Sequence, residues 1–376
     1  MKKLNWKSII GWGVAALVVV GIVGTNMYQE HLKSLTDKRR VYAALPLTGV
    51  LAVAGQDYKK AMDAALSKIK NPQIELVYVD TEFKGDKSVS AVQQATFSDD
   101  NPLILSFATL TSNVLIPYMA NQHRGFVMAG ETIDMPMLKD YTNYQRFSVL
   151  SNESTQLVVD YIKKKYKDKV GVIYSNDPYG SSLATYFMDE MEQNNIPAFK
   201  VSFENNSTDI RNEVLKLLLK HPDLEAIFVA GTATPAYMNI FRQLKQQDFK
   251  GEILTSLCFA QKYVFENLED YANDVIFMTM EPHLDAPRTA KAKEFREFCL
   301  KNEMYPSFSS IEGYDMVNLI NYMVSNGLDF NQDNFLKLKE FDSVAGKVNF
   351  KNLGNATYSF ILAKVKDGKF IPVKEE

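Results

Sequence analysis

Six short segments of the chain combine glycine, hydroxyl and tyrosine side chains, and each directly follows a short apolar run. The segments are Leu47–Gly49, Ala108–Asn113, Gly130–Thr132, Asn176–Gly180, Gly231–Thr234 and Ser256–Ala260. Such residues bring hydroxyl groups and backbone N–H donors close to a small molecule without much bulk. The chemistry that they favour is the binding of a polar solute through hydrogen bonds.

Motifs for common enzyme reactions are absent from the sequence. No GxxxxGK[ST] phosphate loop, GxGxxG turn after a strand, GxSxG nucleophile elbow or HExxH zinc motif occurs. The four histidines are scattered with no cysteine nearby, so no metal site is predicted. The two cysteines, Cys258 and Cys299, cannot build a disulfide framework, and whether they pair stays open. Binding is therefore favoured over catalysis, and we expect no cofactor.

The apolar runs before these segments predict the elements that position them. Ten runs are rich in β-branched and aromatic residues: 41–47, 74–80, 102–107, 125–130, 146–150, 170–176, 198–204, 226–231, 252–257 and 275–280. Continuous apolar runs are typical of strands that are covered on both faces. Amphipathic stretches such as Gly55–Lys70 and Ser154–Lys165 lie between them. The alternation predicts an α/β fold with parallel sheets, in which the strand-end loops share one edge.

The length and the order of these patterns predict two compact units. A chain of 376 residues exceeds the usual size of a single core, and the strand–helix series starts again near Phe147–Asn152. After Met280 the pattern changes to three helices, at Arg288–Lys301, Ile311–Ser325 and Asn334–Glu340. Two β-rich stretches follow, 347–350 and 358–373, and the second contains the hairpin turn Asp367-Gly368.

The N-terminus has the pattern of an export signal. A basic segment, Met1–Lys7, precedes 17 uncharged residues, Ser8–Gly24. No cysteine follows directly and the match to a signal peptidase site is poor, so the pattern favours an uncleaved transmembrane anchor over a cleaved signal. Residues 1–40 would then form the anchor and a juxtamembrane linker, with the body outside the cytoplasm.

The charge of the body excludes one class of partner. Residues 1–40 contain seven Lys or Arg residues against two acidic residues, whereas the remaining residues carry 43 acidic and 35 basic side chains. An acidic body without a basic stripe argues against nucleic acid as a partner.

Several motifs, in the same order along the chain, resemble those of type I periplasmic binding proteins, specifically the leucine/isoleucine/valine-binding branch of ABC transporters. They include LPLTGVLAVAGQDYKKAMDAAL (45–66), FATLTSNV (107–114), VMAGETIDMPML (127–138) and VGVIYSNDPYGSSLATYF (170–187). The resemblance implies two Rossmann-like lobes joined by three crossover strands, which close on a ligand by hinge motion. Lobe I would comprise 41–147 plus 281–352, and lobe II 148–280 plus 353–376.

The resemblance also implies binding roles in lobe I. Ser112, Gly130 and Thr132 match positions that hold the α-carboxylate of an amino acid with hydroxyl and N–H donors. The alternative for Ser112 and Thr132 is an ordinary role in capping a helix.

In lobe II the resemblance implies three further ligand contacts. Tyr179 matches the aromatic residue that closes over the ligand, although it could also simply pack in the core. Gly231 and Thr232 lie in a loop that supplies another contact.

One implied ligand position departs from the family. Leu257 stands where amino-acid binders place the acid that pairs with the α-ammonium, and an unpaired buried ammonium costs about 3–5 kcal/mol. Glu131 could supply the missing charge, or it could be a solvated loop carboxylate. We therefore expect a ligand that bears a carboxylate or an amide but no conventional α-ammonium.

Two functions remain open at this point. The first is a receptor that delivers an amino acid, amide or carboxylate to an ABC permease. The second is a membrane-anchored sensor or envelope scaffold that uses the same fold to contact a partner protein. The anchor and the missing acid favour the second, and an enzyme acting in the cleft has little support.

Overall fold

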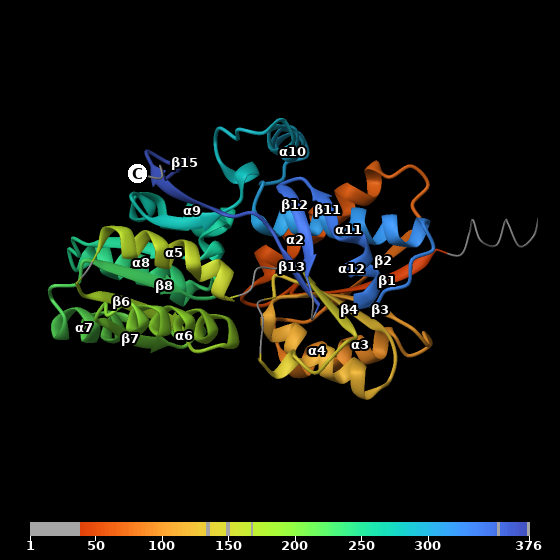
Figure 1. Ribbon diagram of the computed structural model, residues 1–376, viewed down its shortest axis with the longest axis horizontal. Coiled ribbons are helices and arrows are strands. Elements are labelled where there is room, and N and C mark those ends of the chain that lie inside the picture. The colour runs from red at the N-terminus through yellow and green to blue at the C-terminus, as the bar shows by residue number, and fades with distance from the viewer. Residues whose placement is uncertain (1–37, 133–135, 148–150, 167, 352–353, 374–376) are drawn as a thin grey trace, which may run out of the picture.

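The computed structural model describes residues 38–373, except residues 133–135, 148–150, 167 and 352–353. Two α/β lobes lie side by side along the long axis of the molecule, and the described chain begins at the far end of one of them (Figure 1).

Lobe I is built on a five-stranded parallel sheet in the order β2-β1-β3-β4-β5. The strands are β1 (Arg39–Leu45), β2 (Ile74–Asp80), β3 (Leu103–Phe107), β4 (Phe126–Gly130) and β5 (Tyr144–Phe147). Helices α2 (Ala52–Lys68), α3 (Gly85–Ala95) and α4 (Thr109–Asn121) connect the first four strands. Every residue of β3, β4 and β5 is buried. The sequences of β3 and β4 are accordingly free of charge, whereas β5 contains the buried Gln145 and Arg146.

Lobe II is built on a seven-stranded sheet in the order β15-β14-β10-β9-β8-β6-β7. Its parallel strands are β6 (Val170–Ser175), β7 (Ala198–Phe203), β8 (Ala226–Ala230), β9 (Glu252–Thr255) and β10 (Ile276–Thr279). The hairpin of β14 (Ile361–Lys366) and β15 (Lys369–Pro372) adds to β10 in antiparallel fashion. The helices are α5 (Ser151–Lys165), α6 (Pro178–Gln193), α7 (Arg211–Lys220), α8 (Pro235–Gln246) and α9 (Lys262–Leu268). Short 3-10 helices occur at η2 (Leu257–Ala260) and η3 (Glu269–Ala272).

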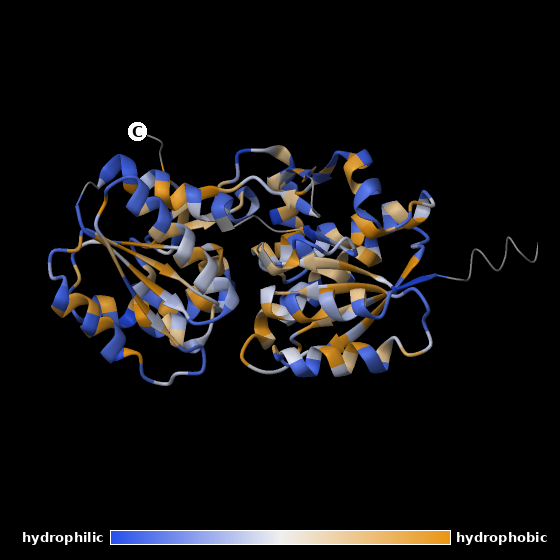
Figure 2. Ribbon diagram, turned by 60° about the horizontal axis from the view of Figure 1, so that its bottom comes forward, coloured by the Kyte–Doolittle hydropathy of each residue, from blue (hydrophilic) through white to orange (hydrophobic). Residues whose placement is uncertain are grey.

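The segment between β10 and β14 returns to lobe I. It contains η4 (Glu281–His283), α10 (Ala290–Lys301), α11 (Phe308–Ser325) and α12 (Gln332–Leu338). A small antiparallel sheet of β11 (Glu340–Ser343), β12 (Gly346–Lys351) and β13 (Asn355–Thr357) follows. Helix α11 packs along α2, and β13 contacts β5. Hydrophobic residues gather in the strands of both sheets and on the helix faces that cover them (Figure 2).

The chain therefore passes three times between the lobes: after β5, after β10 and after β13. Strand β13 pairs with β12, so residues 355–357 belong with the small sheet of lobe I, whereas the resemblance had placed residues from 353 onward in lobe II.

All ten predicted strands of the two large sheets are present, with ends shifted by at most three residues. The Asp367-Gly368 turn is also present, with positive φ at both residues as a tight hairpin requires. The predicted anchor at residues 8–24 lies outside the described residues. Among the residues that are described, no helix is both long and apolar enough to cross a membrane.

Candidate ligand-binding site

The predicted hydroxyl residues of lobe I meet at the carboxyl ends of β3 and β4. The Oγ of Ser112 lies 2.6 Å from the Oγ1 of Thr132 and 2.7 Å from the Oγ of Ser106. Thr132 donates its hydroxyl proton to the carbonyl of Gly130 over 2.8 Å. All three hydroxyl side chains are fully buried. They form a hydrogen-bonded chain that ties the loop after β4 to helix α4.

In lobe II, the turn Asn176–Gly180 begins helix α6. The carboxylate of Asp177 caps the helix by accepting the N–H of Gly180 over 2.8 Å, and it accepts the Thr232 hydroxyl over 2.7 Å. A Cβ atom on Gly180 would lie 2.3 Å from the Oγ of Ser175, so the turn requires glycine here. Asp177 thus fixes the loops after β6 and β8 to each other, and with them Tyr179 and Thr232.

A pocket lies between these two groups of loops, with a cavity volume of about 50 Å³. From lobe I it is lined by Leu51, Ala54, Phe83, Phe107, Ala108, Thr109, Leu110, Glu131 and Phe308. From lobe II it is lined by Asp177, Pro178, Tyr179, Thr232, Ala233, Leu257, Cys258, Gln261 and Tyr263. The wall is mostly apolar and aromatic, with a few polar groups, as is typical of small-molecule sites.

Some of the predicted ligand-binding residues line this pocket and others do not. Tyr179, Thr232 and Leu257 line it directly. The other predicted residues, Ser112, Gly130, Thr132 and Gly231, do not line it. Ser112 and Thr132 hydrogen-bond to each other instead, and an added Cβ on Gly231 would lie 3.0 Å from Phe203.

Contacts across the pocket hold the two lobes together. The side-chain amide of Gln261 in lobe II donates to the Oγ of Ser309 in lobe I over 2.7 Å. Leu257 and Tyr263 of lobe II pack against the hydrophobic core of lobe I, and helices α4 and α6 approach each other. The structure is therefore a closed arrangement of the lobes.

Glu131 is the carboxyl group that lobe I presents to the pocket. Its side chain accepts a hydrogen bond from Ser309. Burial raises the pKa of Glu131 to about 8, and the neighbouring charge of Asp57 acts in the same direction. Without a ligand, this carboxyl is therefore mostly neutral at pH 7.

The backbone of Glu131 is held in an unusual conformation by a second buried acid. Glu131 has a φ of +45°, in the left-handed region that glycine favours. Its N–H donates to the two carboxyl oxygens of Glu312, over 2.9 and 3.1 Å. Glu312 is fully buried, and burial raises its pKa well above the ordinary value. A Cβ on Gly130 would lie 2.6 Å from the hydroxyl of Tyr58 and 2.7 Å from the Oε1 of Glu312, so a larger residue here would displace these two buried side chains.

The pocket contains both the beginning of a helix and several hydrogen-bond acceptors. Helix α4 begins at the pocket, and its N-cap residue Ala108 supplies no capping side chain, so the positive end of the helix dipole lies at the pocket. The acceptors include the carboxyl groups of Glu131 and Asp177 and the side-chain amide oxygen of Gln261. The Oε1 of Gln261 is buried and has no hydrogen-bond partner among the described residues. None of the lining residues is Lys, Arg or His.

Comparison with known families decides the identity of this two-lobed arrangement. Residues 41–369 match the model of a family described as periplasmic binding protein. The chain belongs to this family. Its members are solute-binding proteins outside the cytoplasm, so the chain is a binding protein and not an enzyme. No match was found among curated proteins.

Solved periplasmic binding proteins share the fold at low sequence identity. A leucine-binding protein from Thermotoga maritima superposes with a TM-score of 0.79 at 18% identity, covering 89% of this chain and 98% of the other. A solute-binding protein of an ABC transporter from Rhodopseudomonas palustris, in complex with 4-hydroxybenzoate, gives 0.79 at 18% identity, covering 90% and 96%. A branched-chain amino acid transporter substrate-binding protein from Streptococcus pneumoniae, in complex with isoleucine, gives 0.76 at 18% identity, covering 89% and 97%.

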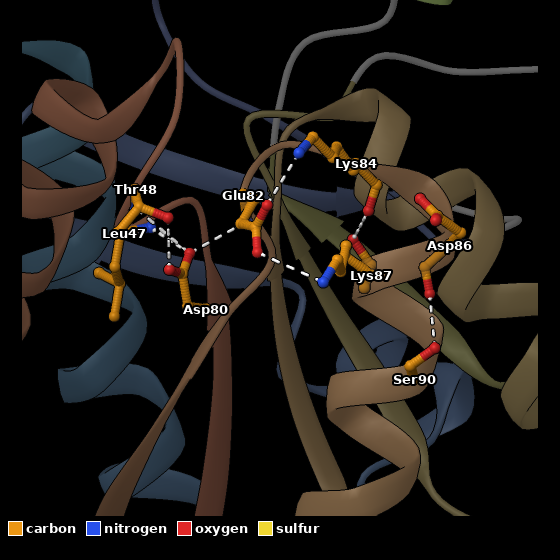
Figure 3. Close-up of polar contacts among 9 residues, drawn as sticks. Leu47, Thr48, Asp80, Glu82, Lys84, Asp86, Lys87 and Ser90 are labelled. Carbon is orange, nitrogen blue, oxygen red and sulfur yellow. Dashed lines mark hydrogen bonds and ion pairs between the residues drawn. The ribbon is translucent and has the colours of Figure 1, made fainter.

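Sequence reasoning missed several residues that line the pocket of this binding protein, among them Phe83, Gln261 and Phe308. Phe83 lies in the loop after β2, next to Glu82, and hydrogen bonds of Asp80 tie this loop to the loop after β1 (Figure 3). The Asp80 carboxylate accepts the backbone N–H groups of Leu47 and Glu82, over 2.9 and 3.0 Å. These bonds lower the pKa of Asp80 although burial opposes them. The sequence did contain a signal for Phe83, because this residue lies in a polar turn that follows an apolar strand, like the six segments from which binding was predicted.

The cysteines of the binding protein are both free thiols. Cys258 lies in the pocket wall, and burial raises its pKa to about 12. It is therefore a neutral, unreactive wall group at physiological pH.

Proposed function

We propose that this binding protein captures a small solute in the interlobe pocket and delivers it to an ABC permease. The observation that carries this proposal is a pocket that strand-end loops of both lobes line together. Such a site is formed only when the lobes close, so ligand binding favours the closed arrangement. The three passages of the chain between the lobes would serve as the hinge.

The polar groups of the pocket support a ligand with two different ends. A carboxylate or amide oxygen fits the uncapped first turn of α4, because the N–H donors of a helix N-terminus favour negative charge. A donor group fits the acceptors Glu131 and Gln261. An apolar body fits the aromatic wall of Phe107, Tyr179 and Phe308.

This assignment revises one expectation from the sequence. Leu257 lines the pocket and supplies no charge. This agrees with the expectation of a ligand that has no α-ammonium to be paired at this position. Glu131 faces the same pocket, however, and a neutral carboxyl would ionise beside an ammonium. We therefore include amino acids among the candidate solutes, together with amides and carboxylates.

The small volume of the cavity favours a second candidate function. A cavity of about 50 Å³ holds only a few water molecules, so the closed pocket is filled largely by the protein's own side chains. A protein that stays closed in this way could act as an anchored sensor or scaffold that contacts a partner protein. The predicted membrane anchor at residues 8–24, if retained, suits this function as well.

Thermal shift followed by calorimetry on the full-length chain tests the first function. The panel would contain branched-chain and aromatic amino acids, their amides, short carboxylates and hydroxybenzoates. A solute at a hundred times its Kd stabilises the protein by about 2.7 kcal/mol, which a melting curve detects. Failure of every compound, together with co-purification of an envelope protein, would favour the scaffold.

A matched pair of variants on helix α6 tests the location of the site. Tyr179→Ala removes a pocket wall, whereas Tyr186→Ala removes a tyrosine further along the same helix that does not line the pocket. We expect Tyr179→Ala to weaken binding at least tenfold, since a buried aromatic contact contributes about 1–3 kcal/mol. Equal effects of the two substitutions would contradict the proposed site.

A further inference from the structure

The charge balance of the interlobe pocket favours a positively charged solute. Among the residues that line it there is no Lys, Arg or His, whereas Glu131 and Asp177 both contribute a carboxyl group. The beginning of helix α4 offers only about half of a positive elementary charge. The hydroxyls of Ser112 and Thr132, which the sequence matched to carboxylate binding, are buried and hydrogen-bonded to each other. An anionic solute would therefore find no basic partner in the lining.

The carboxylate of Asp177 is fully used by contacts within lobe II. Its Oδ1 accepts the N–H of Gly180 over 2.8 Å. Its Oδ2 accepts the hydroxyls of Thr232 and Ser175, over 2.7 and 3.0 Å, and also the side-chain amide of Asn205. A carboxylate with four donors has little capacity left for a ligand. Asp177 therefore makes the pocket more negative but does not supply its main contact.

Glu131 is the lining acid that has an oxygen to spare. Its Oε1 accepts the hydroxyl of Ser309, and no described residue donates a hydrogen bond to its Oε2. The side chain is half-buried and lines the pocket. The backbone N–H of Glu131 donates to both carboxyl oxygens of Glu312, which holds the loop in place. This carboxyl group is therefore positioned before a solute arrives.

The aromatic wall suits both the apolar body and the positive charge of such a solute. Phe107, Tyr179 and Phe308 line the pocket, and aromatic ring faces attract cations more strongly where water is excluded. The close lysine–ring contacts among the described residues involve rings elsewhere, such as Tyr78 and Phe298. The rings of the pocket therefore remain available to a cation from outside.

We infer that the solute captured in the interlobe pocket is a small organic amine in its protonated form, which pairs with the carboxylate of Glu131 and needs no carboxylate of its own. The inference rests on the proposed function and names the class of solute. The cavity volume of about 50 Å³ limits the solute to a small molecule.

Capture of the amine is coupled to the loss of a proton. Burial raises the pKa of Glu131 to about 8, so below pH 8 the ammonium ion replaces the proton, which passes to the solvent. The titratable groups that face Glu131 are Asp57 and Tyr58 on α2, Glu312 on α11, Asp177 and Tyr179 at the start of α6, Cys258 on η2 and Tyr263 on α9. Burial raises the pKa of the tyrosines, Cys258 and Glu312, so these groups stay neutral at pH 7.

Titration calorimetry of the full-length chain with four related compounds tests the class of solute. Isobutylamine, valine, isovalerate and isobutanol share a branched apolar body and differ in their polar groups. We expect isobutylamine to bind at least as tightly as valine, and isovalerate and isobutanol to bind at least tenfold more weakly. Tighter binding of valine, or equal binding of isovalerate or isobutanol, would overturn the inference and leave the proposed function standing. If none of the four binds at millimolar concentration the inference also falls, and the wider panel above then decides the proposed function.

The pH dependence of isobutylamine binding tests the coupling to Glu131. We expect the affinity to rise about tenfold between pH 6 and pH 7 and to level off above pH 8, since the amine itself stays protonated over this range. Calorimetry at pH 6.5 in buffers with different ionisation enthalpies counts the protons, and we expect nearly one to be released. A constant affinity without proton release would refute the pairing with Glu131.

A matched pair of variants locates the contact. Glu131→Gln keeps an acceptor for Ser309 but cannot ionise, and we expect at least tenfold weaker amine binding that no longer depends on pH. Glu192→Gln removes an exposed carboxylate from α6 and should change neither quantity. Unchanged amine binding by folded Glu131→Gln would refute the inference. If circular dichroism shows that Glu131→Gln is unfolded, the pH dependence and the proton count of the wild type decide the result.

Discussion

His283 should make the binding protein unstable in acid. It lies in η4, directly after the passage from lobe II, and is 1% exposed. Its Nδ1 lies 2.8 Å from the hydroxyl of Thr279 and its Nε2 lies 3.2 Å from the hydroxyl of Tyr305. Burial lowers the pKa of His283 from 6.5 to about 3, and the charge of Arg296 acts in the same direction. The folded protein therefore holds this imidazole neutral where an unfolded chain would protonate it.

The direction and size of the effect follow from the two pKa values. Because the folded-state pKa is lowered, His283 contributes full stability above pH 6.5, and that stability is lost as the pH falls toward 3. Each unit between the two pKa values corresponds to about 1.4 kcal/mol. The loss between pH 7 and pH 4 is therefore about 3 kcal/mol, which is a substantial part of the usual stability of a folded domain.

Urea unfolding followed by circular dichroism at pH 7, 6, 5 and 4 measures this loss. Other buried groups titrate in the same range, so the informative quantity is the difference between the wild type and His283→Gln at each pH. We expect that difference to shift in favour of the variant by about 3 kcal/mol as the pH falls to 4. His123→Gln, at an exposed histidine, should leave the pH dependence unchanged. A difference between wild type and His283→Gln that stays constant with pH would refute the reasoning.

Three further predictions concern the walls of the pocket. Burial raises the pKa of Glu131 from 4.5 to about 8, so the stability that its neutral form contributes is lost as the pH rises through that range. Glu131→Gln should therefore gain stability relative to the wild type between pH 5 and pH 9. A difference between the urea midpoints of the variant and the wild type that does not change with pH would contradict this. Gly180→Ala should destabilise the protein by about 1–3 kcal/mol, because the added Cβ would overlap atoms of Ser175. Gly327→Ala is its control: this glycine has a positive φ but open space around it, and the substitution should cost about 1 kcal/mol. Equal melting temperatures of the two variants would argue against the close approach of Gly180 to Ser175. Asp177→Asn should destabilise the protein by about 1–3 kcal/mol and weaken solute binding, because an acceptor for the Thr232 hydroxyl is lost. Melting curves and calorimetry measure the two effects. Asp223→Asn, at an exposed carboxylate, is the control in both measurements.

The sequence was sufficient to locate the strands and turns whose residue types follow directly from burial or from local backbone geometry. The central strands of the two large sheets are covered on both faces, so their apolar runs stand out. The edge strands β2 and β7 are partly exposed, and the ends of all ten predicted strands still lie within three residues of those observed. The turn at Asp367-Gly368 and the glycine of the Asn176–Gly180 turn are local requirements of the backbone, and both are present. Strands β11 and β13 were missed because they are short and only partly buried, which leaves no continuous apolar run.

The sequence by itself thus determined the fold, the order of the strand-end loops and their general binding chemistry, because strand periodicity and turn geometry are local properties. Only the tertiary structure decided which side chains face the pocket. Ser112 and Thr132 turn toward each other, while Glu131 meets Glu312, which lies 181 residues away. Gln261 donates a hydrogen bond to Ser309 across the two lobes, 48 residues further along the chain. Contacts of this kind depend on strand order and lobe packing, which no local pattern of residues encodes.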